Sequence, residues 1–525
     1  MFDLILEGGR VVDGAGNPEF PADVAVNGDR IAAIGRLGGA VARERVTVAD
    51  MVVAPGFIDA HCHSDALPFS ADPLPSKILQ GVTTEINGNC GSTPFPLEPT
   101  TAALLKEHHT GIFSDLTWDW ADLTGYARRA AEVGPVSNMA PLVGHGALRV
   151  AAMGFDNRPP TSDEMKAMKR LLAQALEQGA VGLSSGLIYV PGTYSVTQEL
   201  VALAAELRSS GRPYCSHIRG ETKTLFQAVD EAMAIGEANG VPVEVSHLKA
   251  AGRPNHGRGG ELVARLESGR QRGVAVTGDA YPYNAGSTRM QALLPPWAQE
   301  GGREATLERI QSRETQMRIA DDFETGLPGW ENLAGAGGWE NVRISSVERN
   351  IRYLGKSVQR IAEELQVDPL DAFFRVLIEE RCRPTVVIVM MDESDVQTIL
   401  RHPLVMIGSD AIITRGKPHP RTWGTYPRVV GHYARDVGLF SLQEAVRKCT
   451  SMPAQKFGLM DRGLVRPGMA ADLVVFDPRT VVDLATPEEP EQAPRGMPHV
   501  LVNGRFAVRD GSYTGTRAGR VLLAS

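Results

Sequence analysis

The sequence predicts an α/β protein whose main part is a (β/α)8 TIM barrel, with a small β-sandwich domain formed by the N- and C-terminal segments. Three observations support this fold class. Strand and helix patterns alternate through the middle of the chain with a period of roughly 30 residues, both ends consist of short strand patterns, and the middle part, ~400 residues long, has room for a barrel with insertions. The chain has 525 residues, which is more than one ordinary domain.

The two ends of the chain share one pattern. Short apolar strands separated by Gly, Asn, Asp and Pro are predicted at 3–14, 22–35, 46–56, 461–477 and 498–511. Neither end is long enough to bury a core alone. We therefore expect residues 1–55 and 461–525 to form one small β domain, and residues 56–460 to form the barrel.

The middle of the chain alternates helices and strands. A helix is predicted from Thr161, where Thr161 and Glu164 form a capping box, to Gly179. Strands follow at 180–187, 213–220, 241–249 and 274–283, with helices between them. The length of this part favours a barrel over a doubly wound sheet. Residues 290–345 are rich in Gly and charge, and we expect an insertion there that acts as a lid.

The composition argues against several kinds of binding partner. The net charge of -8 argues against nucleic acid and against an anionic membrane surface. No window approaches the ~18 apolar residues of a membrane helix, and the N-terminus lacks the features of a signal peptide. The five cysteines show no regular spacing, which favours a reduced, cytoplasmic protein. We expect a small-molecule substrate, and the oligomeric state stays open.

Metal-ligand residue types stand at the ends of predicted strands. His61 and His63 are two apart and so point to one side of a strand. Four further residues end later strands: Cys90, His217, His247 and Asp410. Each alone has an ordinary structural explanation, such as a buried core residue or a helix cap. Because reactive residues of a barrel gather at these strand ends, the shared position predicts a zinc site.

The remaining histidines are interpreted differently. His145 also ends a possible strand, and we expect it to line the site without binding the metal. His108, His109 and His402 lie in helical or loop patterns and are interpreted as ordinary polar residues.

With these motifs the sequence resembles the amidohydrolase superfamily, and within it the D-aminoacylases (N-acyl-D-amino-acid deacylases). The resemblance runs nearly end to end and rests on "APGFIDAHCHSD", "TTEINGNCG", "GLSSGLIYVPG", "SHIRGE", "VSHLKAAG", "DAYPYNAGST", "LLPPWAQEGG", "GSDAI", "PHPRTWGTYPRV" and "GMAADLVVFDP". Hydantoinases of the same superfamily carry a carboxylated lysine on the fourth strand, and the candidate strand here, "AVGLSSGLIYV", has none. The resemblance instead implies a tight zinc site at Cys90, His217 and His247. His61, His63 and Asp410 would then frame a second, weaker site.

The resemblance also implies an activity: hydrolysis of the amide bond of N-acyl-D-amino acids. The alternatives are a hydrolase of D-dipeptides or cyclic amides, and a scaffold that has lost catalysis. Zinc can lower the pKa of water toward ~7. Asp410 is placed to take a proton from that water and return it to the leaving nitrogen. Tyr189 resembles the family residue that stabilises the oxyanion, although a packing role is the alternative.

The substrate carboxylate requires cations. We expect Lys249 and Arg421 to bind it, because they lie beside predicted ligands. Further hydrogen bonds are expected from Tyr281, Tyr283, Ser287 and Arg289. The segment 287–302 also carries Met290, Leu293, Leu294 and Trp297, which predict an apolar pocket for the side chain or acyl group. Arg289 argues instead for an acidic side chain.

Overall fold

The middle of the chain is built on parallel strands. The computed structural model describes residues 1–70, 73–109 and 116–524. Six of its strands pair in the order β10-β11-β12-β13-β14-β18, and three more in the order β6-β8-β9. Their bounds are β6 (Phe57–Asp59), β8 (Val82–Asn87), β9 (Asn138–Pro141), β10 (Val143–Gly144), β11 (Leu183–Gly186), β12 (Tyr214–His217), β13 (Val243–Val245), β14 (Val276–Ala280) and β18 (Val405–Ile407).

Backbone hydrogen bonds join the two groups of parallel strands at both edges. Val181 N donates to Pro141 O (2.9 Å), which links the chain before β11 to β9. Ala60 N donates to Ile407 O (3.3 Å), which links the chain after β6 to β18. A short parallel pair, β7 (Cys62–His63) and β19 (Ala411–Ile412), continues this second edge. The first strand with its histidines therefore lies beside the last.

Helices alternate with these strands, as the sequence predicted. Their bounds are α1 (Ala102–His109), α2 (Leu123–Val133), α3 (His145–Met153), α4 (Ser162–Glu177), α5 (Thr197–Ala204), α6 (Leu225–Asn239), α7 (Gly259–Gln271), α13 (Glu393–Arg401), α14 (Arg421–Pro427), α15 (Leu442–Cys449) and α16 (Ser451–Lys456). The capping box at Thr161 and Glu164 is present at the start of α4. Met168, Leu172 and Leu176 recur at helical spacing and lie on the buried side of that helix.

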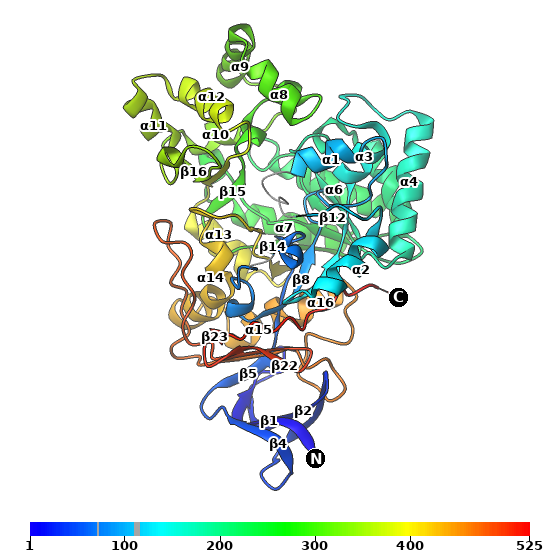
Figure 1. Cartoon of the computed structure of the whole chain (residues 1–525), viewed down its shortest axis with the longest axis vertical. Coiled ribbons are helices and arrows are strands. Elements are labelled where there is room, and N and C mark those ends of the chain that lie inside the picture. Colours follow the sequence, from blue (N-terminus) through cyan, green and yellow to red (C-terminus); the bar gives the residue numbers. More distant parts are fainter. Residues whose placement is uncertain (71–72, 110–115, 525) are drawn as a thin grey trace.

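Strands from both ends of the chain form one sheet (Figure 1), which lies at the lower end of the view. Its members among the described residues are β1 (Phe2–Val11), β2 (Phe20–Asn27), β3 (Arg30–Gly35), β4 (Ala42–Thr47), β5 (Val52–Pro55), β20 (Leu473–Phe476), β21 (His499–Val502), β22 (Arg505–Arg509) and β23 (Ser512–Tyr513). The antiparallel pairing of β5 with β20 joins the two ends. Leu6, Val24 and Leu473 contribute to a common apolar core, so neither end buries its core alone.

An additional segment lies between β14 and β18, and Figure 1 places its helices together at the upper left. It contains an antiparallel sheet in the order β15-β17-β16 and five helices. The bounds are β15 (Ala285–Arg289), α8 (Arg303–Ile310), α9 (Arg313–Thr325), α10 (Leu333–Gly337), β16 (Val342–Ser346), α11 (Val358–Leu365), α12 (Pro369–Glu379) and β17 (Thr385–Val389). The segment is longer than the predicted 290–345, because its sheet needs β17, which comes after both helices α11 and α12.

All five cysteines are buried and free. None of the helices in the described ranges combines the length and apolar character that crossing a membrane requires.

A buried ion pair fixes the strand that carries the histidines. The ammonium group of Lys77 contacts the carboxylate of Asp59 and the hydroxyl of Ser409, and the side chains of Lys77 and Asp59 are 2% and 0% exposed. Ser409 N also donates to Asp59 Oδ1 (2.8 Å). These contacts hold the chain after β6 against the chain after β18.

We expect Lys77→Met to lower the free energy of unfolding by about 3–5 kcal/mol, because Asp59 would stay buried without its cation. Urea denaturation followed by circular dichroism measures this. Lys166→Met is the matched control, since the Lys166 side chain is 74% exposed in its ion pair and its loss should change stability little. Equal stabilities of the two variants would contradict this role of Lys77.

Candidate active site

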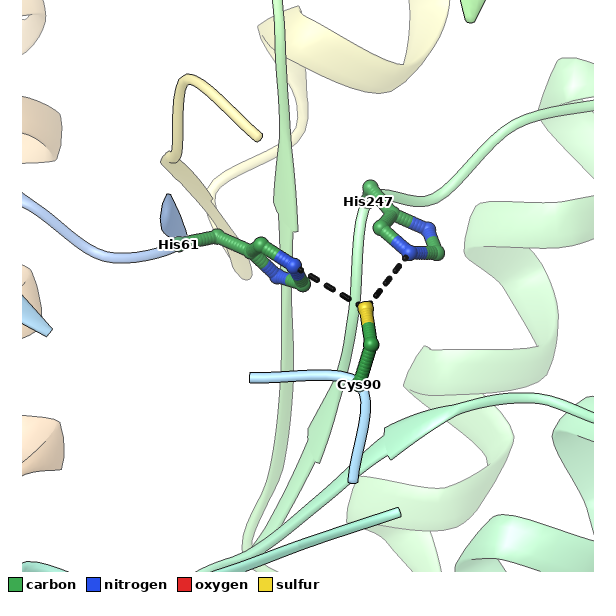
Figure 2. A group of neighbouring side chains, drawn as sticks. All are labelled: His61, Cys90 and His247. Atoms are coloured by element: carbon green, nitrogen blue, oxygen red, sulfur yellow. Dashed lines mark hydrogen bonds between the residues drawn. The ribbon is translucent and has the colours of Figure 1, made fainter. Parts of the chain in front are cut away.

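Side chains that can bind a metal meet at the carboxyl ends of the parallel strands. The Sγ atom of Cys90, which follows β8, lies 3.4 Å from His61 Nε2, 3.5 Å from His217 Nδ1 and 3.6 Å from His247 Nε2. Figure 2 shows the rings of His61 and His247 directed at the Cys90 sulfur from two other strands. Cys90 is therefore the centre of a group of three imidazoles.

A second group shares His61 with the first. Asp410 Oδ1, which follows β18, lies 3.6 Å from His61 Nε2 and 3.3 Å from His63 Nε2. The ligand atoms of His61, His63 and Asp410 lie within 4.8 Å of one another, as do those of His61, Cys90 and His247. The structure thus brings together all six residues that the sequence proposed as ligands.

The donor atoms fit zinc. Tetrahedral zinc with bonds of about 2.0–2.3 Å to nitrogen and sulfur places neighbouring donors about 3.3–3.6 Å apart. The three distances from Cys90 Sγ match this spacing, whereas His217 Nδ1 and His247 Nε2 are closer, at 2.7 Å. One thiol, several imidazoles and a carboxylate are also the ligand types that zinc prefers.

Three of these residues have an unusual backbone. Cys90, His247 and Asp410 have φ values of 53°, 36° and 49°, in the left-handed region that non-glycine residues seldom adopt. Such conformations persist where the surroundings determine them, and they concentrate at functional sites. Here Asp410 N donates to His61 O (2.7 Å). At Gly186 a Cβ would lie 2.1 Å from Cys90 O, so only glycine lets β11 approach the cysteine.

Two carboxylates orient the histidines, and sequence reasoning missed both as functional residues. Asp279, at the end region of β14, lies with Oδ2 3.3 Å from His61 Nδ1, and its Oδ1 accepts from His247 N (2.9 Å). Glu221 Oε1 lies 3.2 Å from His247 Nδ1, while Cys90 contacts the other ring nitrogen, Nε2. Such contacts determine which ring nitrogen faces the metal. Asp279 ends a strand as the ligands do, and that signal could have identified it.

The local charges set the protonation of Cys90 and Asp410. Burial would raise the pKa of the Cys90 thiol, but His61 and His217 outweigh it and hold that pKa well below its usual value. Burial would also raise the pKa of Asp410, but Arg421, His247 and His63 hold it well below its usual range. At neutral pH both groups are therefore anions. The thiolate is the form that binds zinc, and the carboxylate can accept a proton.

The two predicted cations are buried in ion pairs. Arg421 Nη1 lies 2.9 Å from Asp410 Oδ2, and Lys249 Nζ donates to Glu221 Oε1 (2.6 Å). Both cations also approach Tyr281: the Arg421 guanidinium carbon lies 4.5 Å and Lys249 Nζ 5.7 Å from its ring centre. Tyr281 Oη and Arg421 Nε are buried with no hydrogen-bond partner among the described residues. Hydrogen-bonding capacity is therefore left beside Asp410.

The other residues predicted to contact the substrate lie at different distances from the two cations. Ser287, in β15, accepts a hydrogen bond at its backbone oxygen from Arg421 Nη2 (3.4 Å). Tyr283 lies under Arg428, whose guanidinium carbon is 5.0 Å from the ring centre. Tyr189 packs edge-on against the His217 ring at 4.8 Å, and its oxygen accepts from Thr288 Oγ1 (3.1 Å). Burial, followed by the Cys90 charge, raises the pKa of Tyr189, so its hydroxyl keeps a proton to donate.

A cavity opens beside this site. Its walls include His63 and Cys90 together with His108, His109 and Arg289. His108 and His109 lie in a helix, as expected, but the sequence did not predict that they line this cavity. The helix α1 that carries them does not follow a parallel strand end directly, so their position depends on tertiary packing that the sequence pattern did not reveal.

The expected apolar pocket from residues 287–302 is wrong. Met290, Leu293 and Leu294 are 0% exposed and belong to the main apolar core, so they have no surface to offer a ligand. Trp297 stacks on Arg318, with 3.8 Å between guanidinium carbon and ring centre, and donates to Asp322. From this segment Thr288 and Arg289 line the cavity instead.

Comparison with known proteins agrees with this geometry. Residues 48–508 match the amidohydrolase family. The chain is 39% identical to a D-aminoacylase of Alcaligenes xylosoxydans xylosoxydans, over 99% of this chain and 97% of that protein. A D-aminoacylase structure described as having a binuclear metal centre is 38% identical with a TM-score of 0.84 and covers 100% of both chains.

A solved N-acyl-D-glutamate deacylase of Bordetella bronchiseptica, complexed with zinc and a phosphonate mimic of the tetrahedral intermediate, is also similar. It is 36% identical, covers 100% of both chains and has a TM-score of 0.83. These matches, together with the Cys90-centred ligand group, confirm the resemblance seen in the sequence. The chain belongs to the amidohydrolase family, within the group of the D-aminoacylases.

Proposed function

We propose that this chain is a zinc-dependent deacylase that hydrolyses the amide bond of N-acyl-D-amino acids to a carboxylate and a free D-amino acid. The observation that carries the proposal is the contact of Cys90 with three imidazoles next to an ionised Asp410. The relatives named D-aminoacylase and N-acyl-D-glutamate deacylase support the substrate class.

The assignment of the metal ligands to two positions follows the resemblance seen in the sequence. Cys90, His217 and His247 would hold a tightly bound zinc, and His61, His63 and Asp410 a second, weaker ion. Because Cys90 Sγ is as near to His61 as to His217, the thiolate lies between both groups. The binuclear centre of the related D-aminoacylase supports two positions. When bound, zinc supplies Lewis acidity, which makes water more acidic and the amide carbonyl more electrophilic.

The chain's own residues supply proton transfer and orientation. Asp410, held ionised chiefly by Arg421, accepts a proton from the attacking water and donates it to the leaving nitrogen. The Tyr189 hydroxyl can donate to the developing oxyanion, because it lines the cavity beside Cys90 and His63. Asp279 and Glu221 keep the His61 and His247 rings in position.

We infer further that the parallel strands close into a (β/α)8 barrel, with residues 1–55 and 461–525 as a separate β-sandwich domain and the segment after β14 as a lid. The hydrogen bonds at both edges of the parallel strands support closure. The sheet with its own apolar core supports a separate terminal domain. A cytoplasmic location also stays a prediction.

The proposed function is tested by a hydrolysis screen with zinc present. N-acyl-D-amino acids, their L-enantiomers, D-dipeptides and cyclic amides are compared by kcat/KM. The proposal expects the N-acyl-D-amino acids to be the best substrates. A clear lead of D-dipeptides or cyclic amides would replace it with the alternative, and no hydrolysis of any member by the zinc-loaded protein would reject it.

The buried cations predict a strict requirement for the α-carboxylate. Replacing the α-carboxylate of N-acetyl-D-methionine by a carboxamide should lower kcat/KM. The loss should correspond to about 2–5 kcal/mol of transition-state binding, because Arg421 and Lys249 would face a neutral group. Tyr281→Phe removes one hydroxyl and should lower kcat/KM for the acid about tenfold. The same variant should have little effect on the amide. Equal rates for acid and amide would exclude carboxylate binding by these residues.

A further inference from the structure

A basic group closes the cavity beside the metal site. Arg289 Nη1 lies 2.9 Å from His108 Nε2, and its Nη2 lies 3.5 Å from His109 Nδ1. All three side chains line the cavity. No carboxylate lies within ion-pair distance of Arg289 among the residues that the structure describes. The nearby Glu107 is taken by Arg303, at 2.9 Å.

The two imidazoles accept hydrogen bonds without neutralising the guanidinium. Burial, followed by the Arg289 charge, lowers the pKa of both His108 and His109 well below the usual value, so both rings are neutral at neutral pH. Burial lowers the pKa of Arg289 to about 10, which still leaves it a cation. Arg289 is partly buried, and a cation withdrawn from water without a counter-charge is costly, so an anionic ligand would offset that cost.

The rest of the cavity indicates what kind of anion fits. Cys90 and His63 line the end at the metal ligands, and Leu105, Val150 and Val190 supply apolar wall. The residue before Arg289, Thr288, donates to Tyr189, so the basic group is directly connected to the wall of the reaction centre. Neither Arg421 nor Lys249 lines this cavity, so Arg289 is the cation that a ligand in the described part of the cavity would meet.

We propose that Arg289, supported by His108 and His109, binds a second carboxylate of the substrate, carried on a short apolar stem from the scissile amide. This inference rests on the proposed deacylase function and names the substrate class: dianionic N-acyl-D-amino acids. The stem is the side chain of an acidic D-amino acid or a dicarboxylic acyl group, which present the same chemistry to Arg289. The relatives do not decide this, because they include both a D-aminoacylase and an N-acyl-D-glutamate deacylase.

The test uses substrate pairs that differ in charge and not in shape. N-acetyl-D-glutamate is compared with N-acetyl-D-glutamine for the side-chain position, and N-succinyl-D-alanine with N-succinamoyl-D-alanine for the acyl position. In one of the two pairs the dianion should have a kcat/KM about 10- to 100-fold higher, as for a charged hydrogen bond. Arg289→Gln should reduce that ratio to within about threefold, and Arg289→Lys should keep part of it.

Arg318→Gln is the matched control, because Arg318 lies in the same additional segment, is exposed and stacks on Trp297 outside the cavity. It should leave both ratios unchanged. Absence of a dianion preference in both pairs, or a preference that persists in Arg289→Gln, would overturn the assignment of Arg289.

A binding measurement separates this inference from the proposed function. Calorimetric titration of zinc-loaded Asp410→Asn with N-acetyl-D-glutamate and N-succinyl-D-alanine, each against its uncharged partner, needs no turnover. If no N-acyl-D-amino acid is hydrolysed but one dianion binds at least tenfold more tightly in an Arg289-dependent way, the deacylase function fails and the anion site stands. If N-acetyl-D-glutamine is hydrolysed and neither dianion is favoured, the deacylase function stands and the anion site is rejected.

Discussion

Replacing Cys90 by alanine should abolish tight zinc binding and lower kcat/KM about 10³-fold or more. Cys90 Sγ is the atom that approaches three imidazoles within 3.6 Å, and its low pKa makes it a thiolate before any metal arrives. A thiolate contributes strongly to zinc affinity. Loss of the Lewis acid removes several kcal/mol of transition-state stabilisation, which corresponds to this rate effect.

Zinc per chain is measured by atomic emission after dialysis against a weak chelator, and circular dichroism checks the fold. Cys449→Ala is the matched control, because Cys449 is also buried, at the end of α15, and burial raises the pKa of its thiol. It should keep its zinc and its activity. A Cys90→Ala protein that retains a full equivalent of zinc would show that Cys90 is not a ligand.

The grouping of the proposed ligands could be predicted because each of them stands at the same position relative to its strand. His61, Cys90, His217, His247 and Asp410 all come at or just after a parallel strand, and such positions meet at one end of the strands. A pattern that repeats along the chain is visible without knowing any contact. The capping box of α4 is visible for the same reason, since both partners lie within one turn.

What could not be predicted depends on contacts between distant segments. The apolar residues Met290, Leu293 and Leu294 show that a segment is buried, but the pattern does not say whether a core or a ligand covers them. The position of α1 over the cavity brings His108 to Arg289, and no local pattern encodes that contact. The position of Lys249 predicted a cation at the site, but its partner Glu221 comes from a different strand end.

Replacing Asp410 by asparagine should lower kcat by about 10²–10⁴-fold, as the loss of a general acid/base does. Asparagine keeps the shape of the side chain but cannot take up and return a proton. The proposed tight ligands Cys90, His217 and His247 are unchanged, so the variant should retain one equivalent of zinc. KM should change less than kcat, since the cations for the substrate carboxylate also remain.

The design must separate proton transfer from metal binding, because Asp410 Oδ1 also lies 3.3 Å from His63 Nε2 in the second ligand group. Activity is therefore measured at one equivalent of zinc and again in excess zinc. If Asp410 transfers the proton, the loss of kcat is the same at both zinc levels, and Asp163→Asn, whose side chain is 91% exposed, behaves as wild type. If excess zinc restores the rate, Asp410 acts only by helping to bind the second ion, and the proton passes through another group. Arg421 makes the first outcome the expected one, because its charge holds Asp410 ionised and therefore able to accept a proton.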